Sequence, residues 1–234
     1  MTPFKRWLAT VGIVVRRDLL VEWRSRVAVQ QVLPFAGIVV VMFAFAIDDL
    51  TLLPLVAPGL IWLATLFSLL VMVQRSFSFE TEDGALDALR TAGLPASALY
   101  WGKTLALAVQ LVALVLVLLL VAIPLYDVEV EPGSIVLLVT TGLAVTFAMA
   151  AVGTLYGGLA AGARGRETLL PLLLLPVVAP VLIGATRAVE PAIGAEGTVS
   201  EGWPWMGLVV LFAVLYGAAG TVAFGPLIEE EEAA

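Results

Sequence analysis

The sequence contains no cysteine and no histidine, and both absences narrow the chemistry that this protein can perform. Without cysteine, the chain has no disulfide framework, no thiol nucleophile and no thiolate metal site. Without histidine, it lacks the commonest general base, the commonest metal ligand and the usual axial ligand of haem. A nucleotide-binding loop of the form G-x-x-x-x-G-K-[ST] is missing as well. We therefore expect a non-catalytic protein that binds no metal and no cofactor of its own.

Charged residues are scarce in this sequence. They make up 13% of the 234 residues, against 61% hydrophobic residues, and the mean hydropathy is +1.06. Soluble domains average about 25% charged residues and cannot hide so much apolar surface. The composition therefore predicts an integral membrane protein, whose partner is a lipid bilayer and not nucleic acid.

Six long runs without charged residues divide the chain. A membrane span needs about 20 apolar residues, so each run can cross the bilayer once as a helix. The runs offer no ionisable group for a proton relay, an ion-coupled transporter or an intramembrane enzyme. We predict an all-α integral membrane protein, a single transmembrane domain over residues 1–234. Its six transmembrane helices are expected at about 27–47, 50–73, 98–124, 134–161, 168–186 and 204–226.

The basic residues indicate how the spans are oriented. With the N-terminus in the cytoplasm, eleven of the twelve Lys and Arg residues fall in cytoplasmic segments, as the positive-inside rule requires. Only Arg187 falls outside, where the loops are acidic. We expect a multi-pass protein of the cytoplasmic (inner) membrane with both termini in the cytoplasm, ending in a solvated acidic tail at 227–234. The cytoplasmic basic residues are Lys5, Arg6, Arg16, Arg17, Arg24, Arg26, Arg75, Arg90, Lys103, Arg164 and Arg166.

Residues 1–26 are predicted to form an amphipathic helix that lies on the membrane surface. Its apolar side chains share one face, and its cations lie on the opposite face, toward anionic headgroups. Asp18 and Glu22 break this pattern, because they project onto the apolar side. Two interpretations stay open: these carboxylates form a second contact with a partner protein, or they form salt bridges with Arg17 or Arg26.

A polar interval separates the second and third uncharged runs, and it is predicted to hold a short cytoplasmic helix at 79–93. Thr81 or Ser78 can cap its first turn, while Gly93 and Pro95 provide a stop signal. Leucines on one face and carboxylates on the rest make the helix amphipathic. It is either a solvated connection or the surface that meets a soluble partner.

A transporter without an ATP site must take its energy from another subunit, and the 79–93 helix is well placed to receive it. Buried apolar and aromatic anchors would provide most of the binding, while carboxylates would steer the encounter. Gly84 costs roughly 1 kcal/mol against Ala inside a helix, which favours a close approach of the partner to its backbone. The expected ATPase-coupling contacts are Phe79, Glu80, Asp83, Gly84, Leu86, Asp87 and Leu89.

Glycines in the fourth span and prolines in the fifth are expected to shape the bundle. Small residues at four-residue spacing let helix backbones approach closely, and each proline removes a backbone donor from its helix. The fifth span is therefore either a kinked helix that moves during transport or a static kink. The residues are Gly153, Gly157, Gly158 and Gly162 for helix packing, and Pro171, Pro176 and Pro180 for the kinked span.

The residues from Ala57 to Leu89 resemble the haem exporter protein B family (CcmB), the membrane permease subunit of the cytochrome c maturation ABC system. The family pattern A-P-G-[IL]-[IL]-W is present as APGLIW at 57–62, followed by Gln74-Arg75 and by DGALDAL at 83–89. The proline-rich segment Leu170–Thr186 also resembles the fifth span of that family.

This resemblance implies the six-helix fold of ABC type 2 exporters, with an interfacial N-terminal helix and a cytoplasmic coupling helix. It implies a subunit that pairs with a separate ABC ATPase (CcmA-like), which uses ATP, and it allows a homodimer. The further partners would be a haem-handling membrane protein (CcmC-like) and a haem chaperone (CcmE-like), with haem as the candidate substrate. In the family, ATP hydrolysis is tied to release of the haem-loaded chaperone. Two alternatives stay open: a type 2 ABC permease for a lipid, glycan or drug, and a membrane scaffold that transports nothing.

Overall fold

The structure is a computed structural model that describes residues 2–26, 28–49, 51–82, 94–130, 132–161 and 166–229. All regular secondary structure in these ranges is helical, which confirms the all-α prediction. Short 3₁₀ turns precede α6 and follow α7, and a π-helical turn precedes α2. The helices are α1 (Pro3–Ser25), η1 (Ala28–Val32), α2 (Leu33–Ala46), α3 (Leu53–Glu82), α5 (Ala96–Leu125), η2 (Pro132–Ser134), α6 (Ile135–Ala161), α7 (Arg166–Val189), η3 (Glu190–Ile193) and α8 (Val199–Glu229).

Five helices in the described ranges are long and apolar enough to cross a membrane, and the bent pair Pro3–Ser25 and Gln30–Ala46 is a sixth candidate when it is counted as one broken span. The π-helical turn η1 runs directly into α2, so the chain is helical over 28–46. At 1.5 Å per residue that stretch is about 28 Å long, close to the thickness of the hydrocarbon layer. The five long spans are Leu53–Phe77, Ala96–Leu125, Ile135–Ala161, Thr168–Ile193 and Val199–Pro226.

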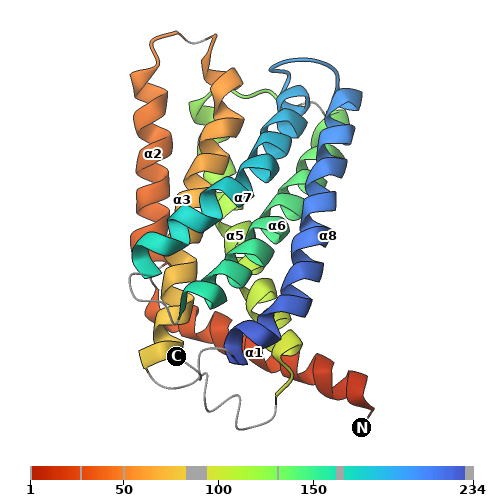
Figure 1. The fold of residues 1–234 in the computed structure, drawn as a ribbon. Helices are drawn as coiled ribbons and strands as arrows, with labels where there is room; N and C mark the ends of the chain where they lie inside the picture. Colours follow the sequence, from red (N-terminus) through yellow and green to blue (C-terminus); the bar gives the residue numbers. More distant parts are fainter. Residues whose placement is uncertain are drawn as a thin grey trace.

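The N-terminal helix α1 lies across one end of the bundle and does not run along it (Figure 1). Its axis makes an angle of 54° with the helix at Gln30–Ala46. Val11 and Val14 are buried against the bundle, whereas Phe4, Ile13 and Trp23 are exposed. Helix α1 thus has apolar side chains that face the protein and others that face away from it, as is typical of a helix at a membrane interface.

The connections α2–α3, α5–α6 and α7–α8 all lie at the end of the bundle opposite α1 (Figure 1). The described charges are segregated accordingly. The end opposite α1 is acidic apart from Arg187, while α1 and its C-cap Arg26 together carry six of the ten described cations. The acidic residues of the opposite end are Asp48, Asp49, Asp127, Glu129, Glu190, Glu196 and Glu201.

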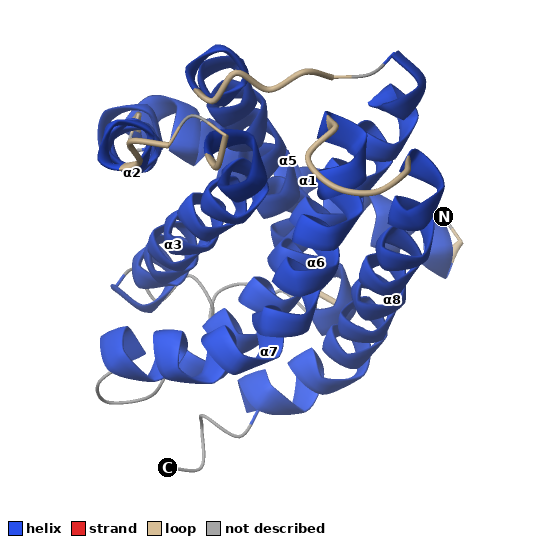
Figure 2. Ribbon diagram, turned by 90° about the horizontal axis from the view of Figure 1, so that it is seen from above, coloured by secondary structure: helices blue, strands red, loops and turns tan. Residues whose placement is uncertain are grey.

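Helix α6 occupies the middle of the bundle, in contact with α3, α5, α7 and α8 (Figure 2). Two of its glycines face α3: a Cβ on Gly157 would lie 2.5 Å from Val73, and one on Gly153 would lie 3.0 Å from Leu69. Gly158 faces α8 instead, where a Cβ would lie 2.7 Å from Phe224. Because these glycines have no side chain, α6 can pack closely against both α3 and α8. Gly162 lies outside the described residues.

Helix α7 contains Pro171, Pro176 and Pro180 and is nevertheless helical from Arg166 to Val189. It crosses α3 obliquely (Figure 1) and also packs against α6 and α8. Each proline removes one backbone donor and disturbs the preceding turn, so the helix is held by its neighbours and not by its own hydrogen bonds alone.

Candidate coupling site

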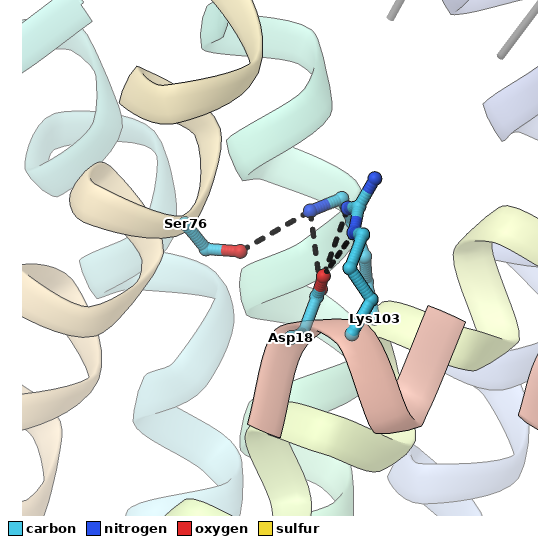
Figure 3. Close-up of polar contacts among 4 residues, drawn as sticks. Asp18, Ser76 and Lys103 are labelled. Carbon is cyan, nitrogen blue, oxygen red and sulfur yellow. Dashed lines mark hydrogen bonds and ion pairs between the residues drawn. The ribbon is translucent and has the colours of Figure 1, made fainter. Parts of the chain in front are cut away.

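Lys103 of α5 is a buried cation that contacts two other helices (Figure 3). Its Nζ lies 3.4 Å from Oδ2 of Asp18 in α1 and donates a hydrogen bond of 3.2 Å to Oγ of Ser76 in α3. The same Nζ lies 4.7 Å from the ring centroid of Phe77. One side chain therefore joins α1, α3 and α5.

The charges of this site are shielded from solvent. The side chain of Lys103 is 5% exposed and that of Asp18 is 13% exposed. Arg17 approaches the other oxygen of Asp18, with Nη2 at 2.8 Å and Nε at 2.9 Å from Oδ1. An unpaired ammonium in such surroundings would be very costly, so the carboxylate, the hydroxyl and the aromatic face together stabilise the charged lysine.

Local packing explains why α1 reaches this depth. Gly102 precedes the lysine, and a Cβ there would lie 2.5 Å from Cβ of Val14 and 3.3 Å from the carbonyl oxygen of Val11. The absence of a side chain on Gly102 thus lets α1 lie directly on α5. Toward the start of both helices, Nε1 of Trp7 donates a hydrogen bond of 3.1 Å to Oγ of Ser97.

The beginning of α5 is anchored to the rest of the bundle as well. The hydroxyl of Tyr100 donates to the carbonyl oxygens of Ala151 in α6, at 3.1 Å, and of Tyr216 in α8, at 3.0 Å. Nε1 of Trp101 donates to Oγ1 of Thr221 in α8, at 3.0 Å. The first two turns of α5 therefore connect α1, α3, α6 and α8.

This junction joins the two helices that come before and after the predicted coupling segment in the sequence. Helix α3 ends at Glu82, so it includes the first residues of the predicted 79–93 helix, and α5 begins at Ala96; Lys103 therefore ties α1 to both of these helices. Phe79 and Glu80 lie in the final turn of α3, and their side chains are outside what the structure describes. The other expected contacts of that segment also lie outside the described residues: Asp83, Gly84, Leu86, Asp87 and Leu89.

The two carboxylates that break the pattern of α1 differ in their surroundings. Asp18 contacts Arg17, as one of the two interpretations expected, and it also contacts Lys103. Glu22 is half-buried, and its carbonyl oxygen accepts a hydrogen bond of 2.9 Å from the backbone of Arg26 at the helix end. Asp18 is thus engaged in a contact within the protein, and little of its side chain is exposed to a partner.

Lys103 was not predicted to belong to a site, because it was counted among the cytoplasmic cations, although the span expected at 98–124 contains it. The structure places Lys103 inside α5, two turns from its start. A signal was present: Asp18 projects onto the apolar side of its helix, which demands a buried cation nearby. Among the described residues, no group of three or more Asp and Glu side chains could hold a metal ion.

Comparison with known proteins settles the family. The family model described as CcmB protein matches residues 9–227, from the second turn of α1 to the last turn of α8. The chain belongs to the CcmB family. It is 34% identical over 217 residues to heme exporter protein B of Rhodobacter capsulatus, covering 91% of this chain and 93% of the relative. Heme exporter protein B of Bradyrhizobium diazoefficiens is 30% identical over 226 residues, covering 93% of this chain and 99% of the relative.

A third relative extends the comparison beyond these two. Heme exporter protein B of Haemophilus influenzae is 32% identical over 182 residues, which is 76% of this chain and 80% of the relative. The resemblance seen in the motif at 57–89 is therefore confirmed over nearly the whole chain. Asp18, Ser76 and Lys103 all lie within the range that the family model matches.

Proposed function

We propose that this protein is the membrane permease subunit of an ABC transporter for haem export and cytochrome c maturation. It couples ATP hydrolysis by a separate subunit to haem delivery or to release of a haem-loaded chaperone. Family membership supports this role, as do the five apolar spans, which become six when the bent pair of α1 and α2 is counted, and the absence of an ATP-binding loop. The ATPase, a haem-handling membrane protein and the chaperone are the partners, and haem is the cargo of the complex.

The observation that carries the proposal is the position of Lys103. A docked ATPase would push on residues 79–93, which are held between the end of α3 and the start of α5. Because Lys103 joins both helices to α1, a displacement of that segment moves the three helices together. The start of α5 passes the movement to α6 and α8 through Tyr100 and Trp101.

The charge distribution supports a cytoplasmic location for this junction. The cations of α1 lie at the same end of the bundle as the end of α3 and the start of α5, and the opposite end is acidic (Figure 1). By the positive-inside rule, the α1 end faces the cytoplasm, where ATP is available. The acidic connections then face the periplasmic side, where a haem chaperone works.

The proposal is tested by replacing one apolar anchor of the coupling segment. Leu86→Glu places a carboxylate where the partner groove requires hydrocarbon, so the ATPase should be lost on co-purification, a change of at least roughly 30-fold in affinity for a central anchor. Asp83→Lys should weaken binding less, and in a salt-dependent way. Leu52→Glu, at the opposite end of the bundle, is the matched control and should retain the ATPase. Wild-type recovery of the ATPase with Leu86→Glu would show that this segment is not the dock.

A further inference from the structure

An apolar crevice of about 180 Å³ lies between α5 and α6, in the half of the bundle away from α1. Its floor is formed by α3, through Ala57, Ile61 and Trp62, all of which are buried. Val189 and Ile193, at the end of α7 and in η3, belong to its lining as well. We call this space the α5–α6 crevice. The floor comes from the A-P-G-x-x-W motif at 57–62, and the proposed coupling to an ATPase does not involve this motif.

The α5–α6 crevice opens sideways, onto the surface that faces the bilayer. The residues at its rim are among the exposed apolar side chains of the two helices: Leu116 is 61% exposed, Val139 54% and Leu143 52%. All three lie within segments that are long and apolar enough to span a membrane, so they face outward at the depth of the hydrocarbon layer. The crevice is thus a hollow in a hydrocarbon-facing wall.

The lining is almost entirely hydrocarbon. None of its residues carries a charge, and its one hydroxyl, on Thr146, already donates to the carbonyl oxygens of Gly142 at 2.8 Å and Leu143 at 3.1 Å. Haem would require cations for its two carboxylates and a ligand for its iron, and the lining offers neither. The occupant must therefore be apolar along its length.

We propose that the α5–α6 crevice binds an acyl chain of a bilayer phospholipid, seated against Trp62. An unfilled hollow forfeits the dispersion contacts of all the atoms that line it, and a lipid chain is the apolar partner that the surrounding bilayer supplies. The indole N–H of Trp62 has no partner among the described residues, but it is itself buried and not presented to the crevice, so the chain is recognised by shape and the headgroup does not contribute. Retention of the lipid is then the same for zwitterionic and anionic headgroups.

Gly142 provides a way to fill the crevice without disturbing the fold. It lines the crevice, and a Cβ built on it meets no atom within 4 Å. Gly37 in α2 is matched to it, since it is also half-buried in a membrane-spanning segment with no atom within 4 Å of its Cβ, and it lies outside the crevice lining. The leucine side chain in Gly142→Leu would therefore occupy the space of the lipid acyl chain, and Gly37→Leu is the control.

The test uses the full chain in vesicles of phosphatidylethanolamine and phosphatidylglycerol that carry a phospholipid with a photoreactive diazirine at the end of one acyl chain. After irradiation, cross-links should concentrate on crevice residues of α3, α5 and α6, above those on Leu172 and Val214, which are equally exposed elsewhere. Gly142→Leu should lower crevice labelling by about tenfold, the effect of losing the burial of two methylene groups. Gly37→Leu should leave labelling unchanged.

Two results would overturn the proposal. The first is crevice labelling in the wild type that does not exceed labelling at Leu172 and Val214; lower labelling would mean that a protein segment covers the crevice. The second is unchanged labelling in Gly142→Leu. If that variant does not fold, Leu143→Trp narrows the same opening from the rim, and the same tenfold decrease is required of it.

Discussion

The two ends of helix α3 are used in opposite ways. At one end, Ser76 and Phe77 contact the buried ammonium of Lys103 at fixed, short distances. At the other end, Ala57 and Trp62 border an open hollow that carries no charge. About 20 Å of helix separates Trp62 from Phe77, at 1.5 Å per residue. One helix therefore combines a site with directional polar contacts and a site defined only by shape.

The contrast indicates what each region tolerates. At the coupling site, the buried charges of Asp18 and Lys103 contact each other across two helices, so the loss of one leaves the other without that partner. At the crevice, no polar partner is lost on mutation, and a change in size is taken up by empty space or by lipid. Substitutions should therefore have large effects near Lys103 and small effects near Trp62.

The largest effect is expected when the ion pair is broken from its acidic side. Asp18→Leu removes a carboxylate from the buried ammonium of Lys103, and it should cost roughly 3–5 kcal/mol of stability. The double variant Asp18→Leu/Lys103→Met removes both charges and should recover most of this loss. Thermal unfolding of the purified protein in detergent measures both variants.

Two further variants sharpen this result. Asp48→Leu removes an exposed carboxylate at the opposite end of the bundle and should leave the unfolding midpoint unchanged. The double variant should also uncouple ATPase activity from the membrane subunit, because α1 is then no longer tied to α3 by a directional contact. Equal stability of Asp18→Leu and the wild type would contradict the structural role of the pair.

An intermediate effect on stability is expected from substituting glycines at which α6 contacts its neighbours. Gly157→Ala puts a methyl group 2.5 Å from Val73 and 2.6 Å from Phe77, and such overpacking should cost about 1–3 kcal/mol. Gly142→Ala puts the same methyl group on the same helix into open space, where helix propensity alone should stabilise it by up to about 1 kcal/mol. Opposite signs for the two variants in chemical unfolding would confirm that α6 is tightly packed on one side and open on another.

The general architecture could be predicted from the sequence because it depends on composition. Uncharged runs long enough to cross a bilayer are visible without any knowledge of tertiary contacts, and so is the bias of the basic residues. The fold class was predicted correctly on this basis, and the family was predicted correctly from the resemblance of residues 57–89. The α1–α3–α5 junction could not be predicted in the same way, since Lys103 and Asp18 are 85 residues apart and their contact depends on how α1 crosses α5.

The motif at 57–62 shows a second limit. Its residues identified the family, yet their part in the structure depends on a separation between α5 and α6 that no periodicity reveals. The same holds for the glycines of α6, whose spacing predicts close packing without indicating the partner. Gly157 faces α3 and Gly158 faces α8 because consecutive residues of a helix point in different directions.

The smallest effect is expected at the floor of the crevice. Trp62 is 4% exposed, and its indole N–H has no hydrogen-bond partner among the described residues. An unsatisfied buried donor costs about 1–3 kcal/mol, and Trp62→Phe removes it. The smaller ring also gives up packing contacts worth a similar amount, so the two contributions should cancel to within roughly 0.5 kcal/mol in chemical unfolding. A loss of several kcal/mol would instead show that the N–H is satisfied in the membrane, by an acceptor that the bilayer or a partner subunit provides.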